Sequence, residues 1–160
     1  MLRGMIIFNF LYLSVVFTIL MVSSAFSQTL IENRPFDYGL VTINSNAGAY
    51  SMTVATNGTI TTNPTYITVF QDGVPARFTI TGLEASTAYS INIPDTTMLY
   101  DGSGPQFFDV INMTISPSSF VTDSNGDGTF LVGSTLRTSG NGSGYPQGTY
   151  TGSVLVTVNN

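Results

Sequence analysis

The chain has 160 residues, among them nine acidic and four basic residues but no cysteine and no histidine. A net charge of −5 without a basic patch speaks against binding to nucleic acids, since nothing would displace counterions from the phosphates. The missing residue types exclude Ser-His-Asp and Cys-His nucleophilic sites, histidine metal ligands and disulfide bonds.

The N-terminal 27 residues have the layout of a secretory signal peptide. Arg3 supplies a short positive region, residues 5–22 are mostly apolar, and small residues follow at the spacing of a cleavage site. The sequence therefore predicts cleavage between Ser27 and Gln28 and export to the periplasm, the cell surface or the medium, with no membrane attachment afterwards. The alternative is a retained transmembrane anchor, because the apolar run is about long enough to span a bilayer.

The predicted mature chain has the length of one domain with its own core. Residues 28–35 are expected to form a short N-terminal lead, because they show no sustained alternation of apolar and polar residues. Residues 36–160 are expected to form a single β-sandwich domain.

Beyond residue 35, apolar and polar residues alternate with a period of two, which is typical of strands with one buried face. Val, Ile, Thr, Tyr and Phe dominate these stretches, as they do in strands. Eight segments are predicted to form strands or strand pairs: residues 38–43, 50–56, 66–70, 76–82, 88–94, 107–116, 129–138 and 148–158.

Turn signals separate the predicted strands. Asn57-Gly58, Asp72-Gly73 and Asp101-Gly102 are pairs that adopt positive φ at low cost. Residues 139–148 are rich in Gly and are expected to form a long flexible loop. Because no segment reads as a crossover helix, the predicted fold class is all-β: an antiparallel Ig-like or pilin-like β-sandwich of about seven to nine strands. A closed barrel is the alternative.

The stretch VTDSNGDGTF, residues 121–130, is the strongest candidate for a metal site. Asp123, Asn125 and Asp127 match the first three ligand positions of a calcium loop. The glutamate that closes such a loop is missing, because Ser134 occupies its position, and the flanks read as strands rather than helices. A turn between two strands is therefore the favoured interpretation, and calcium is the only cofactor that the sequence suggests.

Other candidate sites have less support in the sequence. Alternation places Asp109 on one face with Phe107 and Ile111, so it is expected either to have a partner such as Arg77 or to turn to solvent. Five tyrosines are candidates for a sugar-stacking platform, although core or sheet-edge positions are the favoured interpretation: Tyr38, Tyr50, Tyr66, Tyr89 and Tyr150. With no catalytic set of residues, a non-enzymatic protein is expected.

Three segments resemble a known bacterial family, the domain of unknown function numbered 4402. They are FDYG (36–39), ARFTITGLEASTAYSINIP (76–94) and GTYTGSVLVTVN (148–159). The family shows F-G near its start, A-x-F-x-V-x-G and Y-x-I-x-x-P in its middle, and G-x-Y-x-G before a closing valine-rich strand. Tyr38 replaces the usual Phe before Gly39. The resemblance spans nearly the whole predicted mature chain, and no catalytic residue comes with it.

The resemblance implies an exported bacterial protein, similar to the pilin-like and spore-coat-type sandwiches whose subunits assemble by donating a strand to a neighbour. We therefore expect a surface or extracellular protein, such as a fimbria-like structural or adhesive subunit, whose partners are other copies of itself or related surface subunits. The alternative is a secreted carbohydrate- or calcium-binding sandwich module. The short lead at residues 28–35 argues against strand donation, because a donor strand needs a longer alternating segment.

Overall fold

Antiparallel strands provide all the regular structure in residues 28–94, 97–101 and 105–160, which are the residues that the computed structural model describes. The predicted signal peptide lies outside these residues. None of the described segments is a helix of the length and apolarity needed to cross a membrane. The strands are β1 (Thr29–Arg34), β2 (Asp37–Ile43), β3 (Ser51–Val54), β4 (Ile60–Thr62), β5 (Ile67–Val74), β6 (Ala76–Thr81), β7 (Ala88–Asn92), β8 (Thr97–Tyr100), β9 (Phe107–Ser116), β10 (Ser119–Val121), β11 (Gly128–Thr138) and β12 (Thr157–Asn159).

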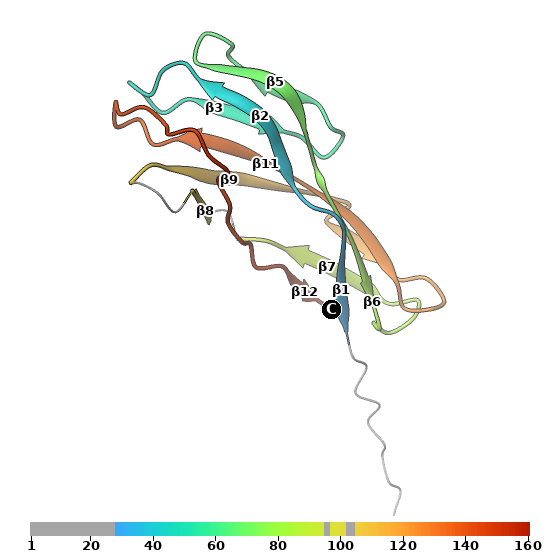
Figure 1. Cartoon of the computed structure of the whole chain (residues 1–160). Coiled ribbons are helices and arrows are strands. Elements are labelled where there is room, and N and C mark those ends of the chain that lie inside the picture. Colours follow the sequence, from blue (N-terminus) through green and yellow to red (C-terminus); the bar gives the residue numbers. More distant parts are fainter. Residues whose placement is uncertain (1–27, 95–96, 102–104) are drawn as a thin grey trace, which may run out of the picture.

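Strand β11 is the centre of the larger layer, a seven-stranded sheet (Figure 1). One edge of β11 pairs first with β6 and then with β3, while the opposite edge pairs with β9. The sheet is extended by β1 beside β6, by β4 beside β3 and by β8 beside β9.

Two smaller sheets form the second layer, β2–β5 and β10–β7–β12. In Figure 1, β2 and β5 lie toward one end of the molecule, and β7 and β12 lie toward the other. Both sheets cover the same face of β11, because Phe130 and Leu136, six residues apart, alternate onto one face. Leu136 is paired with Met52, which packs against Ile67 of β5, and Phe130 packs against Ile91 of β7. The predicted all-β antiparallel sandwich is thereby confirmed.

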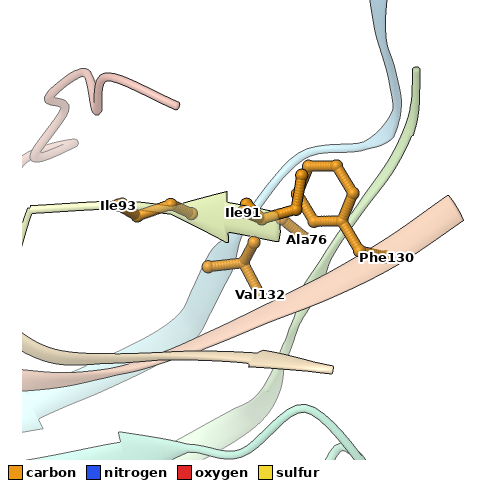
Figure 2. Packing of buried hydrophobic residues seen from close by; sticks show 5 residues of the cluster. All are labelled: Ala76, Ile91, Ile93, Phe130 and Val132. Carbon is orange, nitrogen blue, oxygen red and sulfur yellow. The ribbon is translucent and has the colours of Figure 1, made fainter. Parts of the chain in front are cut away.

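One part of the core lies between β11 and β7. Figure 2 shows Phe130 and Val132 projecting from β11 toward Ile91 and toward Ile93, which directly follows β7. With Ala76 of β6, these side chains are at most 6% exposed. Burying a large apolar side chain stabilises a fold by about 1.5–3 kcal/mol, so this cluster holds the two layers together at the β7 end.

A kinked ribbon connects the two layers. β1 and β2 follow each other with only Pro35 and Phe36 between them, and they pair with β6 and β5, which are separated only by Pro75. Proline has no N–H for the ladder, so each strand breaks at this point and its two halves join different sheets. Arg34 Nε donates a hydrogen bond of 2.8 Å to the Pro75 carbonyl oxygen across the kink.

The glycine of the FDYG motif has a backbone role. Gly39 has a φ of 81°, and a Cβ at this position would lie 2.0 Å from the carbonyl oxygen of Gln71 on β5. The register of the β2–β5 pair shifts just after it, between Leu40 and Val41. No other residue could occupy this bulge without moving β5.

Some local expectations are wrong. Asp72 and Gly73 do not form a turn, since both lie inside β5, where Asp72 is paired with Gly39. The closing strand is shorter than residues 148–158, because only a bridge at Thr151 and the strand β12 are paired there. The predicted lead contains β1, so the sandwich already begins at Thr29.

Candidate functional site

Asp123, Asn125 and Asp127 lie together in a tight turn between β10 and β11. Asp123 Oδ1 accepts hydrogen bonds from the backbone N–H groups of Asn125 (2.8 Å) and Asp127 (3.0 Å). The Asp123 N–H donates to the Asp127 carbonyl oxygen at 3.0 Å. An aspartate side chain that caps its own backbone in this way is turn chemistry and needs no ion.

The turn is anchored to the loop that precedes β7. Gly126 has a φ of 81°, its carbonyl oxygen accepts a hydrogen bond from the Leu83 N–H at 3.1 Å, and a Cβ at Gly126 would lie 2.0 Å from the Leu83 carbonyl oxygen. The buried Thr122 hydroxyl donates to the Glu84 carbonyl oxygen at 2.6 Å. The turn is therefore a fixed part of the sandwich.

Calcium binding at Asp123, Asn125 and Asp127 stays a prediction. Across residues 28–94, 97–101 and 105–160, the acidic side chains form no group of three that could hold a metal ion. The backbone N–H groups of Asp127 and Asn125 lower the pKa of the Asp123 carboxyl below its ordinary value of 3.8. Charge on Asp123 therefore stabilises the turn.

This pKa predicts how stability depends on pH. Because the pKa is lowered in the folded state, the carboxylate contributes stability that is present above about pH 4 and is lost as the pH falls through the folded pKa. In Asp123→Asn this acid-induced loss should be smaller, which denaturant midpoints at pH 7, 5, 4 and 3 would measure. Identical pH curves for the two proteins would refute the effect. Repeating the series in calcium chloride tests the metal site, since an ion bound to the folded protein raises its stability.

Asp109 forms an ion pair that the sequence did not identify. Arg137 Nη2 lies 2.9 Å from Asp109 Oδ2, and the two residues are paired between β9 and β11. The expected partner, Arg77, is wrong: it lies on β6, opposite Leu131 and Arg34. A half-exposed pair of this kind contributes at most about 1 kcal/mol. The partner of Asp109 is therefore the cation Arg137. A pair of catalytic carboxylates would instead need a second acidic residue beside Asp109.

Two buried side-chain amides, Asn46 before β3 and Gln106 before β9, connect their loops to the loop that follows β11. Asn46 is 6% exposed and Gln106 is 4% exposed. Asn46 Oδ1 accepts a hydrogen bond from the Gly140 N–H at 2.8 Å, and Asn46 Nδ2 donates to the Ser143 carbonyl oxygen at 2.8 Å. Gln106 Oε1 accepts a hydrogen bond from Asn141 Nδ2 at 3.2 Å.

These contacts fix a segment that was expected to be a flexible loop. Asn46 Nδ2 also lies 2.9 Å from Asn141 Oδ1 and 3.1 Å from Ser139 Oγ, so its two protons serve three acceptors. The Ser139 N–H donates to the Tyr145 hydroxyl at 2.8 Å, and that hydroxyl donates to the Phe107 carbonyl oxygen at 2.7 Å. The Gly-rich composition indicated a loop correctly but gave no sign of this network.

A cleft of about 290 Å³ lies beside the network, lined by residues 43–47 and 142–144. Every lining residue is uncharged, so the cleft suits a neutral hydroxyl-bearing ligand better than an ion. However, its amides are already engaged within the chain. Asn44 Nδ2 donates to the Thr68 hydroxyl at 2.8 Å and to the Pro64 carbonyl oxygen at 3.1 Å, and Asn46 belongs to the network above.

The five tyrosines proposed for a sugar-stacking platform do not gather on one surface. Tyr50 and Tyr66 stack on each other with ring centroids 3.7 Å apart. The Tyr38 hydroxyl hydrogen bonds to Ser134 inside the sandwich, and burial raises the pKa of Tyr38 well above its ordinary value. Tyr89 belongs to a separate core cluster with Ile80 and Leu83. The core interpretation therefore fits most of these rings.

Strand β1 is an exposed edge of the large sheet. All six of its side chains are exposed, including Leu30 at 42% and Ile31 at 43%. Among the strands in the described part of the chain, it pairs only with β6. Besides the backbone ladder, the Thr79 hydroxyl donates to Asn33 Oδ1 at 2.8 Å. Its free edge offers unpaired backbone groups to another strand.

Comparisons with known proteins give a family and nothing closer. No curated protein and no solved structure matches the chain. A family model described as "Domain of unknown function (DUF4402)" matches residues 29–160. The match begins at the first residue of β1 and runs to the last residue of the chain, so it covers the whole sandwich. The chain therefore belongs to the DUF4402 family, as its FDYG, central and C-terminal segments indicated.

Proposed function

We propose that this chain is an exported, non-enzymatic bacterial surface protein that acts as a fimbria-like structural or adhesive subunit and assembles with copies of itself. The predicted signal peptide supports export. The function of the family is unknown, so the argument for assembly depends on the geometry of the sandwich.

The observation that carries the proposal is the exposed edge strand β1. Soluble β-proteins usually protect an edge with prolines, bulges or like charges, because an open edge pairs with other chains. The register irregularity of β1 is confined to its end, between Glu32 and Arg34, and these two residues carry opposite charges, so Thr29–Glu32 remain an open edge along which copies would not repel each other. Leu30 and Ile31 add apolar surface to the same strand. Such an edge favours association between chains.

The acidic side chains support a non-enzymatic role. Glycoside hydrolysis, the reaction most accessible to a chain without histidine or cysteine, needs two carboxylates that face each other across the substrate. Asp109 is paired with Arg137, and Asp123 caps its own turn. Each of these two carboxylates therefore has a structural role in the fold.

The alternative, a carbohydrate- or calcium-binding module, has less support. The cleft at residues 43–47 and 142–144 has the polarity for a neutral sugar, but the amides of Asn44 and Asn46 hydrogen bond within the chain. A ligand would have to compete with these intramolecular bonds.

The proposal predicts association of the mature protein, residues 28–160. Size-exclusion chromatography with light scattering should show larger species as the concentration rises, and antibodies should detect the protein in the sheared surface fraction of cells. Ile31→Glu, which charges the edge strand, should reduce the association. Val121→Glu is the matched control, because Val121 is 65% exposed on the short strand β10. A monomer at every concentration that is also absent from the surface fraction would contradict the proposal.

A further inference from the structure

We infer that β1 is exchanged between molecules: in an assembly, β1 of one copy pairs with β6 of the next copy and takes the place of that copy's own β1. The inference rests on the proposed self-assembly and names the contact that would produce it. The partner is a second copy of this chain, and the exchanged segment is Thr29–Arg34.

The first argument is that β1 is weakly held within its own molecule. None of its six side chains is buried, so it leaves the sheet without opening a cavity in the core. Its attachment consists of the ladder to β6 and a few polar contacts, such as those of Asn33 with Thr79 and of Arg34 with Pro75. Segments with few buried apolar contacts are the first to open in a native protein.

The second argument is that β6 needs a strand at this edge. Its register with β1 runs from Thr81, opposite Thr29, to Arg77, opposite Arg34. Ile80 of β6 is 3% exposed and has Leu30 as its cross-strand neighbour. If β1 leaves, the backbone N–H and C=O groups of β6 on that side lose their hydrogen-bond partners. Leaving such groups unpaired costs free energy. Another copy of β1 fits this edge, because the same sequence already pairs there.

The third argument is that the chain between β1 and β2, at Pro35, can act as a hinge. Phe36 directly follows the kink and packs against two core clusters, one with Phe130 and the other with Met52. The chain beyond it is therefore anchored, while the register irregularity between Glu32 and Arg34 and the break at Pro35 lie on the other side. A rotation there would move β1 outward as a unit and leave β2 in place.

Exchange of this kind adds little new interaction energy, because the same pairs form within and between molecules. The balance is then set by protein concentration, as in other exchanges of an identical element. Because the surface donated, β1, differs from the surface that receives it, β6, the contact is head-to-tail and can continue from copy to copy. Residues 29–34 already form a paired strand, although the sequence suggested that the lead was too short to donate one.

Mixed single-cysteine variants test the exchange directly, because the chain has no cysteine of its own. Ile31 and Thr79 are cross-strand partners, whose Cβ atoms are typically within reach of a disulfide. Ile31→Cys and Thr79→Cys variants, one of them labelled with ¹⁵N, are unfolded together, refolded at high concentration and oxidised. Mass spectrometry of the assembled fraction should then identify a covalent heterodimer linked through positions 31 and 79.

The matched control is Thr42→Cys mixed with Thr68→Cys, which are partners on β2 and β5 beyond the hinge. This mixture should give no disulfide between positions 42 and 68, because that pairing stays within each molecule. Assemblies that lack the 31–79 linkage would overturn the exchange but leave the proposed surface subunit standing. A protein that forms no assembly, and is absent from the sheared surface fraction, would overturn both.

Discussion

Replacing Phe130 with alanine is expected to lower the free energy of unfolding by about 3–5 kcal/mol. Phe130 is 1% exposed, and it lies where β11 faces Ile91 of β7 across the sandwich (Figure 2). The substitution removes the ring that packs between the two layers. It leaves a cavity between strands that are held in place by their neighbours. The free energy of unfolding of a domain is usually about 5–15 kcal/mol, so the variant should lose a large share of its stability. Equilibrium denaturation in urea would measure this loss.

Phe70→Ala is the matched control for this prediction. It makes the same substitution on β5, but Phe70 is 68% exposed, so its loss should change the free energy of unfolding by about 0.5 kcal/mol or less. Equal effects of the two substitutions would mean that the packing of Phe130 between the layers does not stabilise the fold.

Replacing Asn46 with alanine is expected to lower the free energy of unfolding by about 2–4 kcal/mol. The substitution removes the hydrogen-bond partner of several polar groups at once. The Gly140 N–H and the Ser143 carbonyl oxygen each lose a hydrogen bond of 2.8 Å. A polar group left unpaired in a buried site costs about 1–3 kcal/mol, and the groups of the half-buried Gly140 and the exposed Ser143 should lie at the lower end of this range. Urea denaturation would give the total, and hydrogen exchange should show faster exchange of the Gly140 amide.

Two further variants sharpen this test. Asn46→Asp keeps the oxygen that accepts from Gly140 but places a second oxygen against acceptors, including the Ser143 carbonyl oxygen, so it should not restore stability. Asn57→Ala is the control, because Asn57 is exposed and its side chain accepts one hydrogen bond of 2.9 Å, from the Thr59 N–H. It should cost about 1 kcal/mol. If Asn57→Ala destabilised the protein as much as Asn46→Ala, the buried network would not be a special source of stability.

The strands that alternate most regularly could be predicted from the sequence. β9, β11 and β6 lie where the period-two pattern placed them, because the buried apolar side chains of each strand lie on one face. The short strands β4, β8 and β10, of three or four residues each, were not separately predicted, since alternation needs more residues to be visible. β1 escaped prediction for a different reason: it buries neither face, so nothing imposes a pattern on it.

Contacts between distant segments could not be predicted in this way. Asp109 meets Arg137 because β9 and β11 are neighbours, and a single sequence contains no record of which strands are adjacent. For the same reason, Asn46 gave no sign of its bonds to residues 139–143. By contrast, the turn chemistry of Asp123 is local, and the sequence was sufficient to suggest it.

The position of β11 in the chain affects when this protein can fold. β11 begins at residue 128, and its partners β3, β6 and β9 all precede it, with Thr53 and Thr135 hydrogen bonded across 82 positions of sequence. The large sheet therefore cannot assemble while the first three quarters of the chain are being synthesised, since the strand that joins its two halves is still missing. Folds dominated by such long-range pairs form slowly. The proposed export would benefit from this delay, because the chain would stay extended until β11 is available.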